Sequence, residues 1–250
     1  MQKYILTIAY KGTRYRGWQV QPGKPTVQAA VQAACESVFG CDTAVTGCSR
    51  TDSGVHAKGF VCLAAPSEGA AVPPEALPFA LNAALPDDIA AVSARIAPEG
   101  FHPRYDAVGK EYVYLIRNAR TRDPFCDDTS WLVPKKLDEG LCGAMCREFV
   151  GKKDFRAFMA AGSKITDTVR TVFEFNAERE GDMLAFTVSA DGFLYNMVRI
   201  MVGTVVDAAL KGGTPGDIAA VIASGDRSLA GATAPAKGLC LNKVFYRETL

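Results

Sequence analysis

The sequence predicts an α+β fold made of two ferredoxin-like (RRM-like) subdomains with antiparallel sheets. The chain has 250 residues, enough for two domains of about 100–140 residues. Its composition, 48% hydrophobic and 22% charged, is that of an ordinary globular protein. The predicted elements follow the order β-α-β-β-α-β twice. We therefore expect an N-terminal α+β domain over residues 1–107 and a C-terminal one over residues 108–250.

The first half opens with a short apolar run, Lys3–Tyr10, whose β-branched and aromatic residues predict a strand. A loop follows over Gly12–Gly17. Apolar residues then recur at helical spacing over Thr26–Phe39, with Thr26 as the N-cap and Gly40 as the stop. The other predicted elements are strands over Thr43–Cys48 and Gly59–Ala65, a polar loop over Ser49–Lys58 between them, a helix over Pro74–Leu85 and a strand over Asp88–Ala97.

The second half begins after a connector over Phe101–Gly109. Tyr112, Tyr114 and Ile116 alternate along Lys110–Asn118, which predicts a strand with one apolar face. The remaining predicted elements are a helix over Leu137–Val150, strands over Thr168–Ala177 and Met183–Ala190 around the turn Glu180–Asp182, helices over Phe193–Leu210 and Pro215–Ala223, and a strand over Gly238–Arg247.

The balance of charge excludes a uniformly basic nucleic-acid-binding protein, because the net charge is only +1. The cations are nevertheless concentrated near the N-terminus. Before Glu36, the first acidic residue, come five cations interleaved with tyrosines and a tryptophan: Lys3, Lys11, Arg14, Arg16 and Lys24. Such a segment suits phosphates and bases, although a solvated basic loop beside core aromatic residues would show the same pattern.

The cysteines predict no metal site. Eight cysteines stand at scattered spacings without a CxxC motif, and only two histidines could complete a zinc site. Cys142 and Cys146 share a helix face, but small buried hydrophobic residues explain them better. The sequence also has no apolar run of about 20 residues and no signal peptide. We expect a reduced, cytoplasmic protein without a membrane segment.

One stretch, Cys48–Ala57, concentrates reactive side chains. Asp52 follows Arg50 by two residues and precedes Gly54, which permits a tight backbone turn. An aspartate in this setting could be held ionised as a nucleophile or a general base. An Asx-type turn, with Asp52 bonded to its own backbone and Arg50 in water, would give the same spacing.

Arg50–Ala57, RTDSGVHA, resembles the RTDxGVHA signature of the tRNA pseudouridine synthase A family. Position 49 departs from the family, which usually has glycine where this chain has serine. Five more stretches resemble family motifs in the same order: Tyr10–Gln19 (Y-x-G-x-x-(Y/F)-x-G-(W/F)-Q), Phe101–Arg104 (F-H-x-R), Lys110–Tyr114 ((K/R)-x-Y-x-Y), Phe193–Gly203 (F-x-x-x-M-V-R-x-x-(V/I)-G) and Thr233–Leu239 (TAPAxGL).

The resemblance implies a pseudouridine synthase core and the isomerisation of uridine to pseudouridine at tRNA positions 38, 39 and 40, in the anticodon stem-loop. It implies no cofactor, a tRNA partner and a homodimer. Attack at C1′, attack at C6 and a glycal route all stay open. Two other classes of protein share some of these features: a non-catalytic RNA-binding protein or RNA chaperone, and a thiol–metal protein.

The resemblance also assigns the catalytic residues. Asp52 matches the catalytic aspartate, and Arg199 matches the arginine that pairs with it. An arginine at about 4–6 Å would lower the pKa of an aspartate by roughly 1–3 units. Arg199 has apolar neighbours in sequence on every side, which favours a buried partner over a solvated helix surface. Tyr112 matches the tyrosine that stacks on the target base, and Tyr114 is expected in the core.

The substrate-binding residues are assigned in the same way. Arg50 matches the arginine that enters beside the flipped nucleotide. Leu239 and Leu241 are expected to form an apolar floor under the uracil, although strand alternation alone would also make them core residues. His102 and Arg104 are expected on the RNA backbone, and His56 is expected to support the loop. The residues nominated for tRNA phosphates are Lys11, Arg14 and Arg16, supplemented by Arg117, Arg120, Arg122, Lys152, Lys153 and Arg156.

Overall fold

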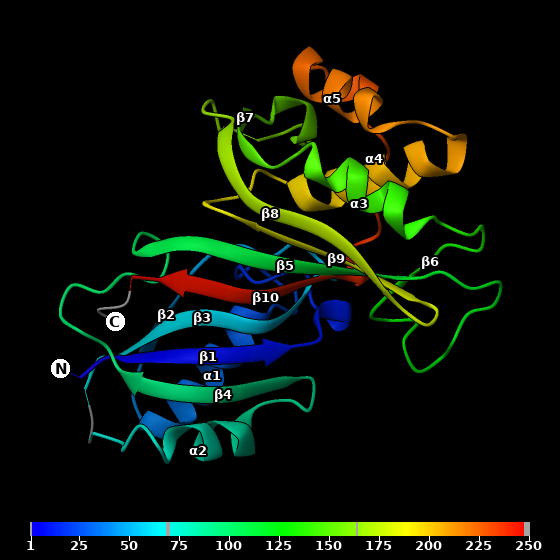
Figure 1. The fold of residues 1–250 in the computed structure, drawn as a ribbon. Coiled ribbons are helices and arrows are strands. Elements are labelled where there is room, and N and C mark those ends of the chain that lie inside the picture. Colours follow the sequence, from blue (N-terminus) through cyan, green and yellow to red (C-terminus); the bar gives the residue numbers. More distant parts are fainter. Residues whose placement is uncertain (1, 69–70, 164, 248–250) are drawn as a thin grey trace. The chain divides into compact units, whose positions relative to one another are not determined.

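A computed structural model describes residues 2–68, 71–163 and 165–247. The chain divides into two compact units, Met1–Val108 together with Cys240–Leu250, and Gly109–Leu239 (Figure 1). The units differ from the predicted domains, 1–107 and 108–250, in the last strand, which groups with the first unit. Each unit is described here by itself, and the predicted division into two functional domains stays a prediction.

The first unit has the predicted order β-α-β-β-α-β. The four strands within residues 4–96 pair antiparallel in the order β4-β1-β3-β2, which is the ferredoxin-like arrangement, and the last strand, β10 (Leu239–Tyr246), joins this unit as a fifth. The predicted fold class is confirmed for this unit. Its elements are β1 (Tyr4–Tyr10), α1 (Val27–Phe39), β2 (Thr43–Gly47), β3 (His56–Pro66), α2 (Leu77–Ala84) and β4 (Ile89–Ile96).

Strand β3 begins at His56, three residues earlier than predicted. Its first residues pair in parallel with β10 (Leu239–Tyr246), where Cys240 lies opposite His56 and Leu241 opposite Ala57. The predicted loop over Ser49–Lys58 is therefore too long. The partner strand comes from the far end of the chain, so the local sequence pattern could not indicate it.

Helices α1 and α2 pack on the strands of the first unit, α1 against β2 and β3 and α2 against β4. The predicted stop at Gly40 is confirmed by its left-handed backbone, with φ at 70°. Thr26 occupies the predicted N-cap position, but its side chain makes no capping hydrogen bond. Helix α2 starts later than predicted, and Pro78 lies in its first turn, where no intrahelical N–H is needed.

The second unit has a sheet in the order β5-β9-β8-β7. The three described pairings that join these strands are all antiparallel. Two short strands, β6 and β7, were not predicted because a few residues carry no periodicity. The elements are β5 (Ala107–Arg117), β6 (Trp131–Leu132), α3 (Glu139–Arg147), β7 (Gly151–Asp154), β8 (Val169–Glu180), β9 (Met183–Ala190), α4 (Met197–Lys211) and α5 (Pro215–Ser224).

Helix α3 packs on β8 and contacts α4 and α5. Its Cys142 and Cys146 are fully buried, and burial raises the pKa of Cys142 to about 11, so both thiols behave as small hydrophobic residues. In the described residues no group of three or more His, Cys, Asp or Glu side chains could hold a metal ion. None of the helices described is long and apolar enough to span a membrane.

Candidate active site

The loop between β2 and β3 carries Asp52 in a tight turn. The Val55 N–H donates to the carbonyl oxygen of Asp52 at 3.1 Å, and Gly54, the third residue of the turn, has φ at 79°. A positive φ at this position defines a type II turn and requires glycine. Asp52 itself is half-buried. The turn thus holds the aspartate at a fixed place at the start of β3.

The N-terminal segment Tyr10–Trp18 binds this loop through hydrogen bonds. The hydroxyl groups of Tyr10 and Thr51 share a buried bond of 2.8 Å. The Trp18 N–H donates to the Thr51 carbonyl at 3.1 Å, and the Ser53 hydroxyl donates to the Tyr15 carbonyl at 3.2 Å. Residues on both sides of Asp52 are therefore anchored to a segment about 40 residues earlier in the chain.

Two glycines let this segment approach the loop closely. A Cβ atom on Gly12 would lie 1.9 Å from the Val55 carbonyl oxygen, and one on Gly17 would lie 2.4 Å from the Thr51 carbonyl oxygen. Gly17 also has φ at 86°, which disfavours any side chain. The two sequence motifs, far apart in the chain, form one rigid cradle for Asp52.

His56 is buried beneath the cradle. Its Nδ1 accepts a hydrogen bond of 3.0 Å from the Gly12 N–H. This bond joins the N-terminal segment to the first residue of β3. The contact agrees with the supporting role expected of His56.

Ser49 and Arg50 lie at the start of the same loop. Arg50 is exposed. Ser49, the departure from the family pattern, causes no backbone strain, because among the described non-glycine residues only Asn196 has a positive φ.

Asp88 is a supporting residue that the sequence did not indicate. Its carboxylate accepts from Arg14 Nε and from the Tyr15 hydroxyl, each at 2.7 Å, and its carbonyl accepts from the Lys11 N–H at 2.9 Å. Burial alone would raise the pKa of Asp88, but the bonds from Arg14 and Tyr15 outweigh burial and lower it. Burial and the bond to Asp88 raise the pKa of Tyr15 to about 12.

Arg199 lies in the first turn of α4 and is half-buried. Its Nε donates to the Ala234 carbonyl and its Nη1 to Asn196 Oδ1, both at 2.7 Å. A cation in the first turn of a helix is unfavourable by roughly 0.3–1 kcal/mol. The two hydrogen bonds fix the guanidinium at that unfavourable place, which indicates a role other than helix stability. Asn196 was not predicted, because a left-handed asparagine leaves no sequence pattern.

The segment Thr233–Leu239 is closely packed against α4 and β5. A Cβ atom on Gly203 would lie 1.9 Å from the Ala232 carbonyl oxygen, and the Ala234 N–H donates to the Arg199 carbonyl at 3.1 Å. The helix motif and the TAPAxGL motif thus form a second rigid cluster.

Tyr114 closes this second cluster. Its hydroxyl donates to the Pro235 carbonyl at 2.8 Å, and a Cβ atom on Gly238 would lie 2.5 Å from its ring. Tyr114 is fully buried, as expected for a core residue. Tyr112, on the same strand face, is 8% exposed and meets the Phe193 ring edge-on at 5.1 Å. Its stacking on a base stays a prediction.

The proposed floor residues and the Phe101–Arg104 motif have defined places. Leu239 and Leu241 are buried in β10. His102 Nδ1 accepts from the N–H groups of Arg104 at 3.1 Å and Tyr105 at 3.3 Å, so it caps a turn. Arg104 is exposed. His102 is half-exposed, and contact of His102 and Arg104 with the RNA backbone stays a prediction.

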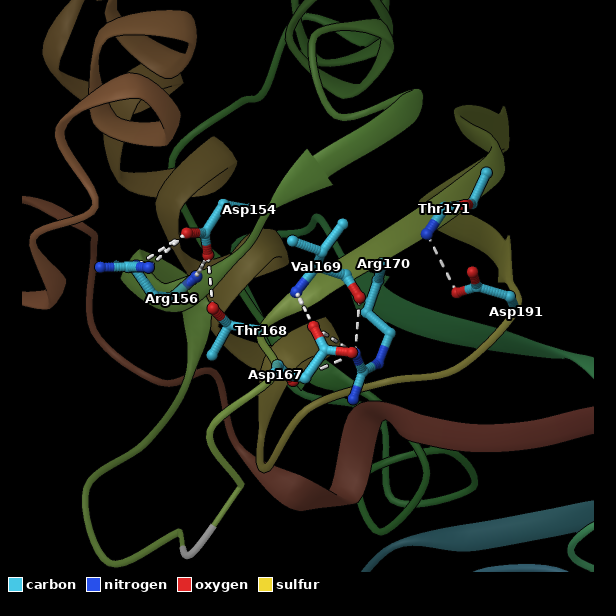
Figure 2. A network of polar contacts seen from close by, with 8 residues as sticks. All are labelled: Asp154, Arg156, Asp167, Thr168, Val169, Arg170, Thr171 and Asp191. Atoms are coloured by element: carbon cyan, nitrogen blue, oxygen red, sulfur yellow. Dashed lines mark hydrogen bonds and ion pairs between the residues drawn. The ribbon is translucent and has the colours of Figure 1, made fainter.

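Several of the nominated phosphate-binding cations have carboxylate partners. Arg14 pairs with Asp88, and Arg117 pairs with Asp123 at 3.5 Å and with Asp182 at 3.6 Å. In Figure 2, Arg156 points toward Asp154, which accepts from it at 2.7 Å. The charges of these cations are therefore partly neutralised by their carboxylate partners.

The rest of the nominated set is less compensated. Within the described part of the chain, four exposed cations of this nominated set have no ion-pair partner: Arg16, Arg120, Arg122 and Lys152. The Lys153 ammonium donates to the Glu148 carbonyl.

The polar network in Figure 2 orders the chain between β7 and β8. In it, Asp154 accepts hydrogen bonds from Arg156 and, at 2.5 Å, from the Thr168 hydroxyl.

An aspartate on a hydrogen-bonded loop and an arginine oriented by two hydrogen bonds on a helix are side chains of the kind that enzymes use. Residues 6–106 and 145–247 match the profile of a family described as tRNA pseudouridine synthase. The chain belongs to this family. It is an isomerase that converts uridine in tRNA to pseudouridine.

Relatives along the whole chain bear the name tRNA pseudouridine synthase A. The one from Moorella thermoacetica is 45% identical over 244 residues and covers 96% of this chain and 98% of its own length. The one from Clostridium acetobutylicum is 40% identical over 246 residues, with 98% and 100% covered. A solved Cbf5–Nop10–Gar1 complex is similar at 13% identity and a TM-score of 0.40, over 97% of this chain and 59% of that one.

Proposed function

We propose that this protein isomerises uridines 38, 39 and 40 in the anticodon stem-loop of tRNA. The main support is the rigid cradle around Asp52, in which the two N-terminal motifs shared with the synthase A family are bonded to each other. Relatives at 40–45% identity bear the synthase A name. Membership of the family shows the reaction, the isomerisation of uridine in tRNA to pseudouridine. The proposal adds the target positions 38, 39 and 40.

The reaction exchanges one glycosidic bond for another. The N1–C1′ bond breaks, the uracil turns, and a C1′–C5 bond forms, while C5 loses a proton and N1 gains one. No atom or electron is supplied from outside, so we expect no cofactor. In this proposal the ionised Asp52 is the catalytic group, acting on the sugar or on the base. The three open routes, attack at C1′, attack at C6 and a glycal route, differ in the substrate atom with which Asp52 reacts.

Arg199 is proposed as the cation that keeps Asp52 ionised. A guanidinium near a carboxylate favours the charged form and so lowers its pKa. The bonds from Arg199 to Asn196 and Ala234 support this role, because they orient the guanidinium before substrate binds. Tyr112 is proposed to stack on the target base, a contact worth about 1–3 kcal/mol without sequence preference.

Substrate binding is proposed to need a flipped nucleotide. Arg50, exposed on the loop next to Asp52, would take the place of the extruded base, and extrusion costs a few kcal/mol. Leu239 and Leu241 would lie under the uracil, and Arg104 and the exposed cations would contact phosphates. Phosphate contacts position an RNA without reading its sequence, which suits an enzyme that accepts three neighbouring uridines.

The test is pseudouridine mapping on an unmodified tRNA transcript, with wild-type protein and the Asp52→Ala variant. We expect pseudouridine at positions 38–40 with the wild type alone, and tRNA binding by both. Equal product from both proteins would remove Asp52 from the mechanism. Binding without product by the wild type would favour the RNA-binding protein instead.

We also propose a cytoplasmic homodimer, as the family resemblance implies. A tRNA substrate is consistent with the cytoplasm. The chain mass is 26.7 kDa, so light scattering should give about twice that value. A single-chain mass at assay concentration would contradict the dimer.

A further inference from the structure

A basic hollow opens in the second unit, and none of the residues that line it is assigned to catalysis. It has a volume of about 630 Å³ and lies among the end of β5, the segment before α3 and the turn between β8 and β9. The charged and polar side chains that line it are Asn118, Arg120, Lys135, Lys136, Arg179 and Asp182.

The charge of this hollow is strongly positive. Four of its lining residues are cations and one, Asp182, is a carboxylate. Asp182 is 3.6 Å from Arg117, which offsets its charge. The whole chain carries a net charge of only +1, so this concentration is local. An open cavity with such a lining attracts anions.

Part of the hollow is organised before any ligand binds. Arg179 Nη2 donates to Asn118 Oδ1 and to the Leu137 carbonyl, both at 2.9 Å. The Asn118 amide in turn donates to the carbonyls of Val133 at 2.8 Å and Lys135 at 2.9 Å. This network fixes one guanidinium at the wall, so less side-chain entropy is lost on binding.

The other cations can reach a ligand. Arg120 and Lys136 are exposed and have no ion-pair partner within the residues the structure describes. The Lys135 ammonium donates one bond, to the Leu210 carbonyl at 2.6 Å, and an ammonium has three donors. Gly181 leaves the turn side open, because no atom lies within 4 Å of its Cβ position.

We propose that this hollow binds a backbone phosphate of tRNA. The inference rests on the proposed function, because it takes the anion to be part of the RNA substrate. A fixed guanidinium beside adaptable cations suits a phosphodiester oxygen, and such contacts release counterions without reading bases. The hollow is a positioning site and takes no part in the bond exchange.

The test measures tRNA affinity at several salt concentrations for an Arg120→Ala/Lys136→Ala double variant. We expect Kd to rise roughly tenfold and the slope of log Kd against log salt to fall by about 1–2. The rise in KM for tRNA should match the rise in Kd. A charge-keeping Arg120→Lys/Lys136→Arg variant should retain the affinity.

A matched control removes two cations elsewhere in the same unit. Arg147 and Lys211 are exposed and do not line the hollow. Arg147→Ala/Lys211→Ala should bind tRNA as the wild type does. An equal loss in both double variants would reduce the effect to net charge and overturn the proposal.

Two more outcomes separate the two proposals. If the wild type forms pseudouridine but the Arg120/Lys136 variant binds tRNA unchanged, the hollow is not a tRNA site, even if inorganic phosphate binds there by calorimetry. If the wild type binds tRNA through the hollow but forms no pseudouridine, the proposed function fails and the binding site stands.

Discussion

The Cβ position of Gly17 lies 2.4 Å from the carbonyl oxygen of Thr51. No side chain fits this contact, so the N-terminal segment and the Asp52 loop can pack together only through glycine. This close approach joins residues that are 34 positions apart in the chain, and a substitution at Gly17 tests the cradle without changing Asp52.

Gly17→Ala should break the cradle. The variant adds a clash with backbone to the cost of a left-handed alanine, and we expect a loss of more than about 3 kcal/mol in the free energy of unfolding. Gly23→Ala is the matched control, because Gly23 also has a positive φ, 67°, but no atom within 4 Å of its Cβ position. It should lose only about 1–2 kcal/mol. Urea denaturation measures both, and similar losses would contradict the packing argument.

Gly203→Ala tests the second cluster. In a helix, alanine is normally favoured over glycine by roughly 0.5–1 kcal/mol. Here its Cβ would lie 1.9 Å from the Ala232 carbonyl oxygen, so we expect a net loss of about 2–4 kcal/mol. Gly143→Ala in α3 meets only Arg147 Nη1, at 3.8 Å, and should be stabilising. Thermal unfolding of the two variants should therefore shift in opposite directions, and a shared direction would refute the contact.

Asn196→Gly isolates the orientation of Arg199. Glycine keeps the left-handed backbone, with φ at 58°, but removes the acceptor for Arg199 Nη1. If Arg199 serves Asp52 as proposed, kcat should fall about tenfold, equivalent to about 1.4 kcal/mol in the barrier, while the melting temperature changes little. Unchanged kcat, measured under single-turnover conditions at saturating tRNA, would show that this bond does not orient a working group.

Acid should weaken the cradle through Asp88. The folded pKa of Asp88 is below its ordinary value of 3.8, so this carboxylate stabilises the fold above pH 3.8 and loses that contribution as pH falls through the lower, folded pKa. Asp88→Asn should therefore be less stable than wild type at pH 7, and the difference should shrink toward pH 3. Denaturant titrations at both pH values measure it. A constant difference would show that the charge of Asp88 is not what stabilises the segment.

Local features of the fold could be predicted from the sequence, and distant partners could not. Gly40 ends α1 because glycine alone adopts the left-handed backbone easily, and that preference is visible in the sequence. The start of β3 at His56 depends on β10, and the place of Arg14 depends on Asp88, 74 residues away. Both are set by tertiary pairing, which leaves no local periodicity.

The candidate site divides in the same way. The catalytic roles of Asp52 and Arg199 are predicted from motifs, and they stay predictions. Asn196, which orients Arg199, was missed, because an asparagine with a positive φ has no pattern of its own. Arg14 and Arg156 were nominated for phosphates from their charge, but their carboxylate partners could be found only in three dimensions.

The most direct measurement is proton release from C5 of the target uridine. A tRNA transcript tritiated at uracil C5 should release tritium to water with the wild-type protein, because the new C1′–C5 bond displaces that proton. Asp52→Asn keeps the size of the side chain and removes its charge. We predict full release by the wild type and none by Asp52→Asn, although both bind the tRNA. Release at the wild-type rate by Asp52→Asn would contradict the account.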